Sequence, residues 1–224
     1  MEFISVFDVI GPNMIGPSSS HTAGACAIAN MARILFGKPI VRVEFTLYGS
    51  FAKTYKGHGT DRALLGGILG FDTDDRRIRS AYECAENHGI SYQFRADSQT
   101  GVAHPNTADV TMYSFDGASM TVRGESTGGG KIRICMIDNV QVDFTGEYCT
   151  IVVRQYDKPG VLEFILSQIS RYGINIAFLK LHREEKGGIA YTVIGSDDNI
   201  PRNIVSDLEG HEHILNALCI PARR

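Results

Sequence analysis

The chain has 224 residues, of which 43% are hydrophobic, and a formal net charge of −3. That length suits one large or two ordinary domains, each able to bury a core. The mixed charges, with a slight acidic excess, argue against a nucleic-acid or membrane-surface role, and no apolar stretch approaches the roughly 20 residues of a membrane span. Residues Met1–Ile10 have neither a basic start nor a long apolar run, so we expect no signal peptide and a cytoplasmic location.

A polar segment, Gly16–Gly24, precedes the first predicted helix and reads Gly-Pro-Ser-Ser-Ser-His-Thr-Ala-Gly. Helical apolar periodicity follows over residues 25–36, and Gly37 is a typical stop. Hydroxyls at a helix N-terminus lie beside unpaired N–H groups and the positive end of the dipole, which favours a small anion such as a carboxylate or a phosphate. An ordinary N-cap needs one serine rather than three, and His21 adds a group that can move protons near neutral pH.

The next part of the chain mixes predicted strands and helices. Alternation over residues 40–51 predicts a half-buried strand, and residues 62–69 predict a short helix capped by Thr60 or Asp61. The other expected elements are a helix within 74–88 and strands over 90–94, 108–115 and 119–123, the last two joined by a hairpin turn at Asp116-Gly117. The glycine triplet 128–130 is either a pocket wall or a plain turn.

The pattern restarts near Tyr148. The expected elements are a strand over 151–154, a helix over 161–172, strands over 174–182 and 188–196, a helix over 203–209 and a strand over 214–220. This βαββαβ order is typical of a ferredoxin-like split unit. We therefore expect an α+β protein with a boundary near 144–148, which separates a mixed α/β domain of residues 1–145 from a ferredoxin-like domain of residues 148–224.

Three histidines lie in polar motifs. The motifs around His21 and His58 are predicted at helix N-termini, and the motif around His104 is predicted in a loop between strands. Each combines a histidine with hydroxyl or amide donors, and together they resemble the lining of a pocket for a small polar molecule with an ionised carboxylate. A metal bound by the three histidines stays open as an alternative, although no two of them are spaced i, i+4.

The five cysteines are odd in number and scattered: Cys26, Cys84, Cys135, Cys149 and Cys219. None forms a Cys-x-x-Cys pair, so neither a zinc knuckle nor a self-contained iron–sulfur site is indicated. Most have apolar neighbours, which is typical of small core residues in a reduced compartment.

Four motifs, in this order, resemble the iron–sulfur-dependent L-serine dehydratase family, and specifically the beta subunit of its two-subunit form. They are Gly-Pro-Ser-Ser-Ser-His-Thr at 16–22, Gly-His-Gly-Thr-Asp at 57–61, His-Pro-Asn-Thr at 104–107 and the glycine triplet. The resemblance covers essentially the whole chain, and its first motif is the most specific. It implies that the first domain is similar to a substrate-binding regulatory domain of some phosphoglycerate dehydrogenases. The second, with Asp-x-Pro-Gly at 157–160 and Gly-Ile-Asn-Ile at 173–176, resembles an ACT domain.

The resemblance also implies an activity, the conversion of L-serine to pyruvate and ammonia. In the family a [4Fe–4S] cluster takes the substrate hydroxyl at an open iron while a base removes the α-proton. The cluster ligands would belong to a partner alpha subunit, and no metal ligand is expected in this chain. His21 and His58 are the candidate catalytic residues. The candidate substrate-binding residues are Ser18, Ser19, Ser20, Thr22, Gly59, Thr60, Asp61, His104, Asn106 and Thr107.

In the second domain, Gly160, Asn175 and Ile176 are candidate ligand or interface residues. Gly160 lets backbone approach a small ligand, and self-association through this ACT-like domain is expected. A function of another class also stays open, that of a non-catalytic amino-acid sensor that regulates a partner. The ACT-like half and the missing cluster site favour the sensor, whereas His21 and His58 argue against it because binding a carboxylate needs no titratable imidazole.

Overall fold

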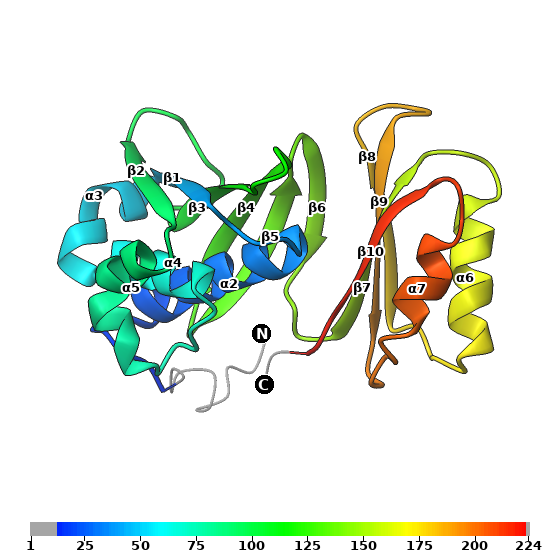
Figure 1. Cartoon of the computed structure of the whole chain (residues 1–224), viewed down its shortest axis with the longest axis horizontal. Helices are drawn as coiled ribbons and strands as arrows, with labels where there is room; N and C mark the ends of the chain where they lie inside the picture. The colour runs from blue at the N-terminus through cyan, green and yellow to red at the C-terminus, as the bar shows by residue number, and fades with distance from the viewer. Residues whose placement is uncertain (1–12, 223–224) are drawn as a thin grey trace, which may run out of the picture. The chain divides into compact units, whose positions relative to one another are not determined.

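A computed structural model describes residues 13–222, so the expectation about a signal peptide in residues 1–10 lies outside the described range. The chain divides into two compact units between Asp138 and Asn139, and each unit combines helices with a sheet (Figure 1). The expected mixture of helices and strands is confirmed. Over residues 13–222, no helix has the length and apolar character needed to cross a membrane.

The first sheet is mixed and has the strand order β2-β1-β3-β4-β5-β6. Its strands are β1 (Arg42–Tyr48), β2 (Ser91–Asp97), β3 (Thr107–Tyr113), β4 (Ser119–Gly128), β5 (Lys131–Ile137) and β6 (Val140–Phe144). Strand β1 runs parallel to β2 and antiparallel to β3. The alternation predicted for β1 is confirmed, because Val43, Phe45 and Leu47 are fully buried on the same face.

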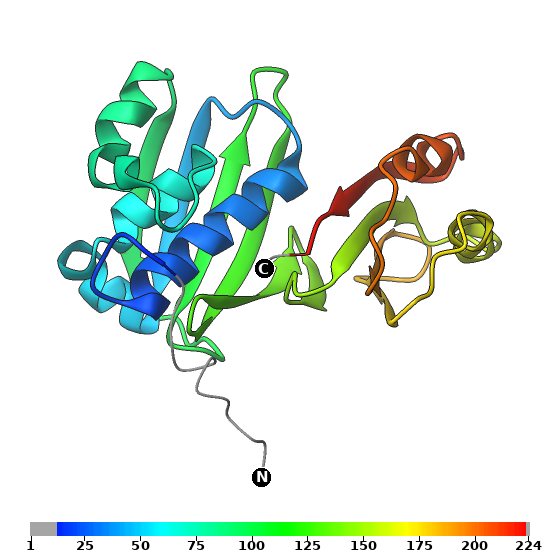
Figure 2. The same ribbon diagram turned by 90° about the horizontal axis from the view of Figure 1, so that it is seen from below.

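The helices of the first unit cover that face of the sheet. They are the π-helical turn η1 (Ser19–Gly24), α2 (Ala25–Phe36), α3 (Gly49–His58), α4 (Thr60–Ile68), the 3-10 turn η2 (Arg76–Ser80) and α5 (Ala81–Asn87). Phe94 stacks on Phe45 and also contacts Tyr55 of α3 and Tyr82 of α5, so these helices lie on the Phe45 side. Figure 2 shows α2 crossing the strands of this sheet.

Helix α2 begins and ends where the sequence predicts, and Gly37 ends it in the left-handed conformation with a φ of 64°. More of α2 is buried than its predicted apolar face, because α4 packs against it as well as the sheet. Gly67 of α4 comes so close that a Cβ there would overlap the carbonyl oxygen of Cys26. Helix α2, which directly follows the serine cluster, is therefore packed on two sides.

Two expectations about the segment after β1 are wrong. The predicted strand over 40–51 ends at Tyr48, because Gly49, with a φ of 53°, turns the chain directly into α3. His58 is consequently the last residue of α3, and its motif, residues 57–61, continues into the N-terminus of α4, where the sequence predicts it. Gly59 (φ 68°) separates α3 from α4 and takes the N-cap position itself, so neither Thr60 nor Asp61 caps α4. The apolar alternation continues through Phe51, so the sequence pattern predicts one long strand and gives no sign of the junction between β1 and α3.

The second unit has a four-stranded antiparallel sheet in the order β10-β7-β9-β8. Its elements are β7 (Cys149–Tyr156), α6 (Val161–Arg171), β8 (Phe178–Arg183), β9 (Ile189–Ser196), α7 (Ile204–Glu209) and β10 (Ile214–Ile220), in the predicted βαββαβ order. Both helices lie on one side of these strands (Figure 2). Aliphatic side chains such as Ile151, Ile165 and Leu208 fill the core between them.

Candidate active site

The serine cluster forms the first turn of the helix that leads into α2. Ser18 is the N-cap: its Oγ accepts a hydrogen bond from the backbone N–H of His21 at 3.1 Å. Its carbonyl oxygen accepts one from the N–H of Thr22 at 2.8 Å. The ordinary capping role thus belongs to Ser18, and the half-buried Ser19 and Ser20 are not needed for it.

The structure brings together the two histidines that the sequence singles out. The ring centroids of His21 and His58 are 4.8 Å apart with an interplanar angle of 34°. The Thr22 hydroxyl donates to the carbonyl oxygen of His58 at 3.1 Å, which ties η1 to the end of α3. The Nδ1 atom of His58 is buried and has no hydrogen-bond partner. A buried ring nitrogen left unsatisfied is costly, which is typical of an atom that meets a ligand or partner.

His21 has contacts on both ring nitrogens. Its Nε2 lies 3.0 Å from Ser50 Oγ and its Nδ1 lies 3.4 Å from Ser18 Oγ. Phe51 contacts the ring edge-on, with centroids 5.3 Å apart. Burial, and to a smaller extent the charge of His58, lower the pKa of His21 below its usual 6.5. The neutral imidazole, which is the form that accepts a proton, therefore prevails at neutral pH.

The loop 104–107 lies against the first turn of α3. The carbonyl oxygen of Pro105 accepts a hydrogen bond from the N–H of Ser50 at 2.6 Å. Within the loop, Nδ1 of His104 accepts from the N–H of Asn106 at 3.2 Å, and the Thr107 hydroxyl donates to the His104 carbonyl at 2.5 Å. The third motif is thus connected to Ser50, a neighbour of His21, by a backbone hydrogen bond. The His104 ring forms its hydrogen bond within its own loop.

The glycine triplet forms the turn between β4 and β5, and all three residues have positive φ. This turn also faces the serine cluster, because a Cβ on Gly128 would lie 4.0 Å from Ser20 Oγ. Nearby in the same strand, Ser126 donates its N–H to the carbonyl of Asn106 at 2.9 Å. Ser126 Oγ and Asn106 Oδ1 are both buried without a partner. Two buried polar atoms near this end of β4 are thus left without a hydrogen-bond partner.

Asp61 is buried and already engaged. Its carboxylate accepts hydrogen bonds from the Tyr82 hydroxyl at 2.7 Å and from the N–H of Arg62 at 2.8 Å. Burial, together with the bond to Asp61, raises the pKa of Tyr82. The neighbouring Thr60 is fully buried, and its hydroxyl has no partner. Asp61 thus joins α4 to α5. Of the two neighbours Thr60 and Asp61, only Thr60 has a side-chain polar atom without a partner.

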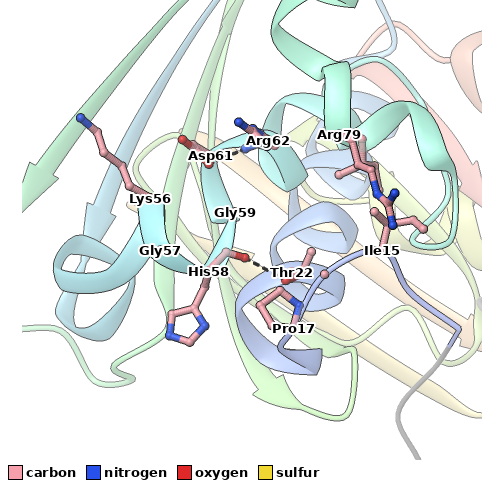
Figure 3. Close-up of a pocket in the computed structure, with 12 residues that line it drawn as sticks. Ile15, Pro17, Thr22, Lys56, Gly57, His58, Gly59, Asp61, Arg62 and Arg79 are labelled. Atoms are coloured by element: carbon pink, nitrogen blue, oxygen red, sulfur yellow. Dashed lines mark hydrogen bonds between the residues drawn. The ribbon is translucent and has the colours of Figure 1, made fainter.

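A cavity of about 490 Å³ lies beside these motifs (Figure 3). Its lining consists of Ile15, Gly16, Pro17, Thr22, Lys56, Gly57, His58, Gly59, Asp61, Arg62, Ile78 and Arg79. Lys56, Arg62 and Arg79 bring positive charge to this lining and Asp61 brings a negative one. The His58 imidazole points away from both arginines (Figure 3). The sequence alone does not indicate these arginines or Ser50, because an exposed arginine or a serine outside a motif carries no signal of its own.

The cysteines of this chain do not fit a [4Fe–4S] cluster. Such a cluster is typically held by about four cysteine thiolates. Within residues 13–222, no group of three or more Cys, His, Asp or Glu side chains is placed to hold a metal ion. Burial raises the pKa of Cys135 and of Cys219 to about 12, so both remain protonated thiols, which are poor ligands.

The candidate residues of the second unit are not assembled by direct bonds. Gly160 has a φ of 85° at the N-cap of α6, and a Cβ there would meet only open space. Asn175 is exposed and Ile176 is half-buried. Across the described chain, no hydrogen bond links Gly160 to Asn175.

Comparison with known proteins decides the family. The model of the serine dehydratase beta chain family matches residues 5–134. The probable L-serine dehydratase beta chain of Bacillus subtilis is 42% identical over 96% of this chain and 97% of its own length. The L-serine dehydratase beta chain of Peptoniphilus asaccharolyticus is 39% identical over 95% of this chain and 96% of its own.

The chain belongs to the L-serine dehydratase beta chain family. It is thus a subunit of a lyase, and the enzyme interpretation of the sequence is confirmed over the sensor. This beta chain is also 24% identical, over 86% of its length, to the D-3-phosphoglycerate dehydrogenase of Methanocaldococcus jannaschii, of which the match covers 36%.

Proposed function

We propose that this beta chain completes the active site of a two-subunit L-serine dehydratase and supplies the proton-transfer groups His21 and His58. The single observation that carries the proposal is the pairing of their rings at 4.8 Å. One imidazole is held neutral by a lowered pKa, and the other has a buried nitrogen without a partner. The α-proton of serine is weakly acidic, so elimination needs a positioned base together with stabilisation of the developing negative charge.

The hydroxyls of Ser19 and Ser20 are proposed to bind the substrate carboxylate. They lie in the first turn of a helix, where unpaired N–H groups and the positive end of the dipole favour an anion. Ser18 is already used as the N-cap and Thr22 by the His58 carbonyl, which leaves these two serines for the ligand. The remaining candidates would then form the wall of the site: Thr60, His104, Asn106 and Thr107. Gly59 and Asp61 would hold the chain around them in place.

The [4Fe–4S] cluster is proposed to belong to the alpha chain that a beta chain implies as its partner. The scattered positions of the cysteines and the raised pKa of Cys135 and Cys219 support that assignment, because no set of side chains in residues 13–222 is placed to hold a metal ion. This chain's own share of the reaction is to bind and orient the substrate and to move protons at the two imidazoles.

The second unit is proposed to be an ACT domain through which beta chains self-associate. Its βαββαβ order and four-stranded antiparallel sheet support the assignment. A bound amino acid would lie near Gly160, Asn175 and Ile176, where the φ of 85° at Gly160 leaves the backbone uncovered. An architectural module with no ligand is the alternative.

The proposed function is tested by His21→Ala and His58→Ala in the assembled enzyme. We expect kcat to fall by roughly 10²- to 10⁴-fold with a much smaller change in KM, because removal of general acid–base help has that effect. His213→Ala, a partly exposed histidine of the second unit, is the matched control and should leave kcat within about twofold. Iron content, measured for every variant, excludes loss of the cluster as the cause. Near-normal kcat in both site variants would place the base on the other subunit.

A further inference from the structure

Two consecutive residues at the start of α3 hold the imidazole of His21. Ser50 Oγ lies 3.0 Å from Nε2, and the Phe51 ring contacts the imidazole edge-on at 5.3 Å. Neither residue belongs to any of the four sequence motifs. Both face His21 because Gly49 turns the chain out of β1 immediately before them.

Ser50 is itself held in place by its surroundings. Its N–H donates to the Pro105 carbonyl at 2.6 Å, and its carbonyl oxygen accepts from the Thr54 hydroxyl at 2.9 Å. A Cβ on Gly49 would lie 2.5 Å from the same Pro105 oxygen, so only glycine lets the loop come this close. The Ser50 hydroxyl therefore extends from a fixed backbone toward a fixed ring.

The two ring contacts of His21 differ in strength. The distance of 3.0 Å to Ser50 is that of a good hydrogen bond, whereas the 3.4 Å to Ser18 is long. Ser18 Oγ also already accepts the backbone N–H of His21. A neutral imidazole has one N–H donor and one acceptor nitrogen, and a serine hydroxyl can serve either of them. Because Ser18 Oγ already accepts a backbone N–H, its O–H is the group left to face Nδ1, which favours the lone pair on Nδ1 and the proton on Nε2.

We propose that Ser50 is a positioning residue that fixes the orientation and tautomer of His21. The Nε2–H of His21 donates to Ser50 Oγ, and the lone pair remains on Nδ1, where the weakly bound Ser18 hydroxyl leaves it available to accept a proton. When Nδ1 becomes protonated, the bond to Ser50 persists, so the ring does not reorient between its neutral and charged states. His58 is the neighbouring titratable group that influences His21. The catalytic consequence rests on the proposed function of His21, whereas the tautomer does not.

The test compares Ser50→Ala with Ser50→Thr, which keeps the hydroxyl, and with Ser167→Ala, an exposed serine of α6, as the control. Nitrogen NMR of the His21 ring in the full chain measures the tautomer directly and needs no activity. We expect wild type and Ser50→Thr to carry the proton on Nε2, and Ser50→Ala to populate both tautomers. In the enzyme assembled with its alpha chain, Ser50→Ala should lower kcat roughly tenfold with little change in KM, which is the effect of one lost hydrogen bond.

The outcomes separate this proposal from the proposed function. An unchanged His21 tautomer in Ser50→Ala overturns the proposal, whatever happens to activity. A changed tautomer with an unchanged kcat supports the proposal that Ser50 fixes the tautomer of His21, and it contradicts the catalytic role of that histidine. Thermal unfolding of each variant shows whether the fold is intact, and the backbone bond from residue 50 to Pro105 is preserved in all of them.

Discussion

The two units of this chain use their polar residues in different ways. In the first, motifs far apart in the sequence are connected, as in the bond from Thr22 to the His58 carbonyl and the bond from Ser50 to the Pro105 carbonyl. In the second, two helices pack over an aliphatic core, and the candidate residues Gly160 and Asn175 are exposed without a bond between them. The difference supports the proposals that the chemistry belongs to the first unit and that the second serves assembly or regulation.

Removing a hydroxyl from the serine cluster should have the largest effect on substrate binding. Ser19→Ala or Ser20→Ala removes a charge-assisted hydrogen bond of about 1.5–3 kcal/mol to the carboxylate, so KM should rise roughly tenfold to a hundredfold with kcat little changed. Steady-state pyruvate formation measures both constants. Ser167→Ala in the second unit is the control, and an equal rise in KM there would remove the contrast between the units.

Close glycine contacts provide a second test, on stability. A Cβ at Gly67 meets the backbone of α2, whereas a Cβ at Gly195 in β9 meets the side-chain ring of the half-buried Phe178, which can yield more readily than backbone. We expect Gly67→Ala to lower the free energy of unfolding by about 1–3 kcal/mol and Gly195→Ala by less. Urea unfolding of the full chain measures the difference. A larger loss at Gly195 would mean that the second unit is the more tightly constrained one.

Self-association should depend on the second unit. A chain that ends at Phe144 retains β6 and the six-stranded sheet but lacks β7 to β10. We expect light scattering to give the mass of a monomer for this shortened chain and a larger mass for the full one. Circular dichroism confirms that the shortened chain is folded. An unchanged oligomer would move the interface to the first unit.

The smallest expected signal is amino-acid binding by the second unit. Calorimetric titration of the full chain with L-serine should give heat that Asn175→Ala reduces, if the site near Gly160 takes a ligand. Ser19→Ala is the matched variant, because it removes binding at the first unit instead. Heat that depends on Ser19 and not on Asn175 would leave the second unit an architectural role.

How much the sequence predicts also differs between the two units. The closing strand Ile214–Ile220 and the helix that starts at Val161 begin where periodicity places them, because local apolar patterning dominates there. In the first unit, α2 is predicted to the residue, but α3 is missed. Only the tertiary contact between Gly49 and Pro105 explains why the chain turns at that point.

The candidate site follows the same rule. Motif composition identifies His21 and His58. Their close approach, however, depends on the turn at Gly49, which the sequence pattern does not predict. Only the fold brings Ser50, Arg62 and Arg79 to the site, since nothing in the sequence around them distinguishes them from surface residues. Asp61, chosen from its motif, is bound to Tyr82 in a way that only the packing of α5 on α4 reveals.

The central claim is that this chain supplies imidazoles and substrate contacts but no cluster. The direct test is to measure iron and pyruvate formation from L-serine for the purified chain alone and after anaerobic mixing with a reconstituted alpha chain. The chain alone should be colourless, free of iron and inactive, and mixing should restore pyruvate formation. A chain that binds a cluster by itself, or that deaminates serine unaided, would contradict the account.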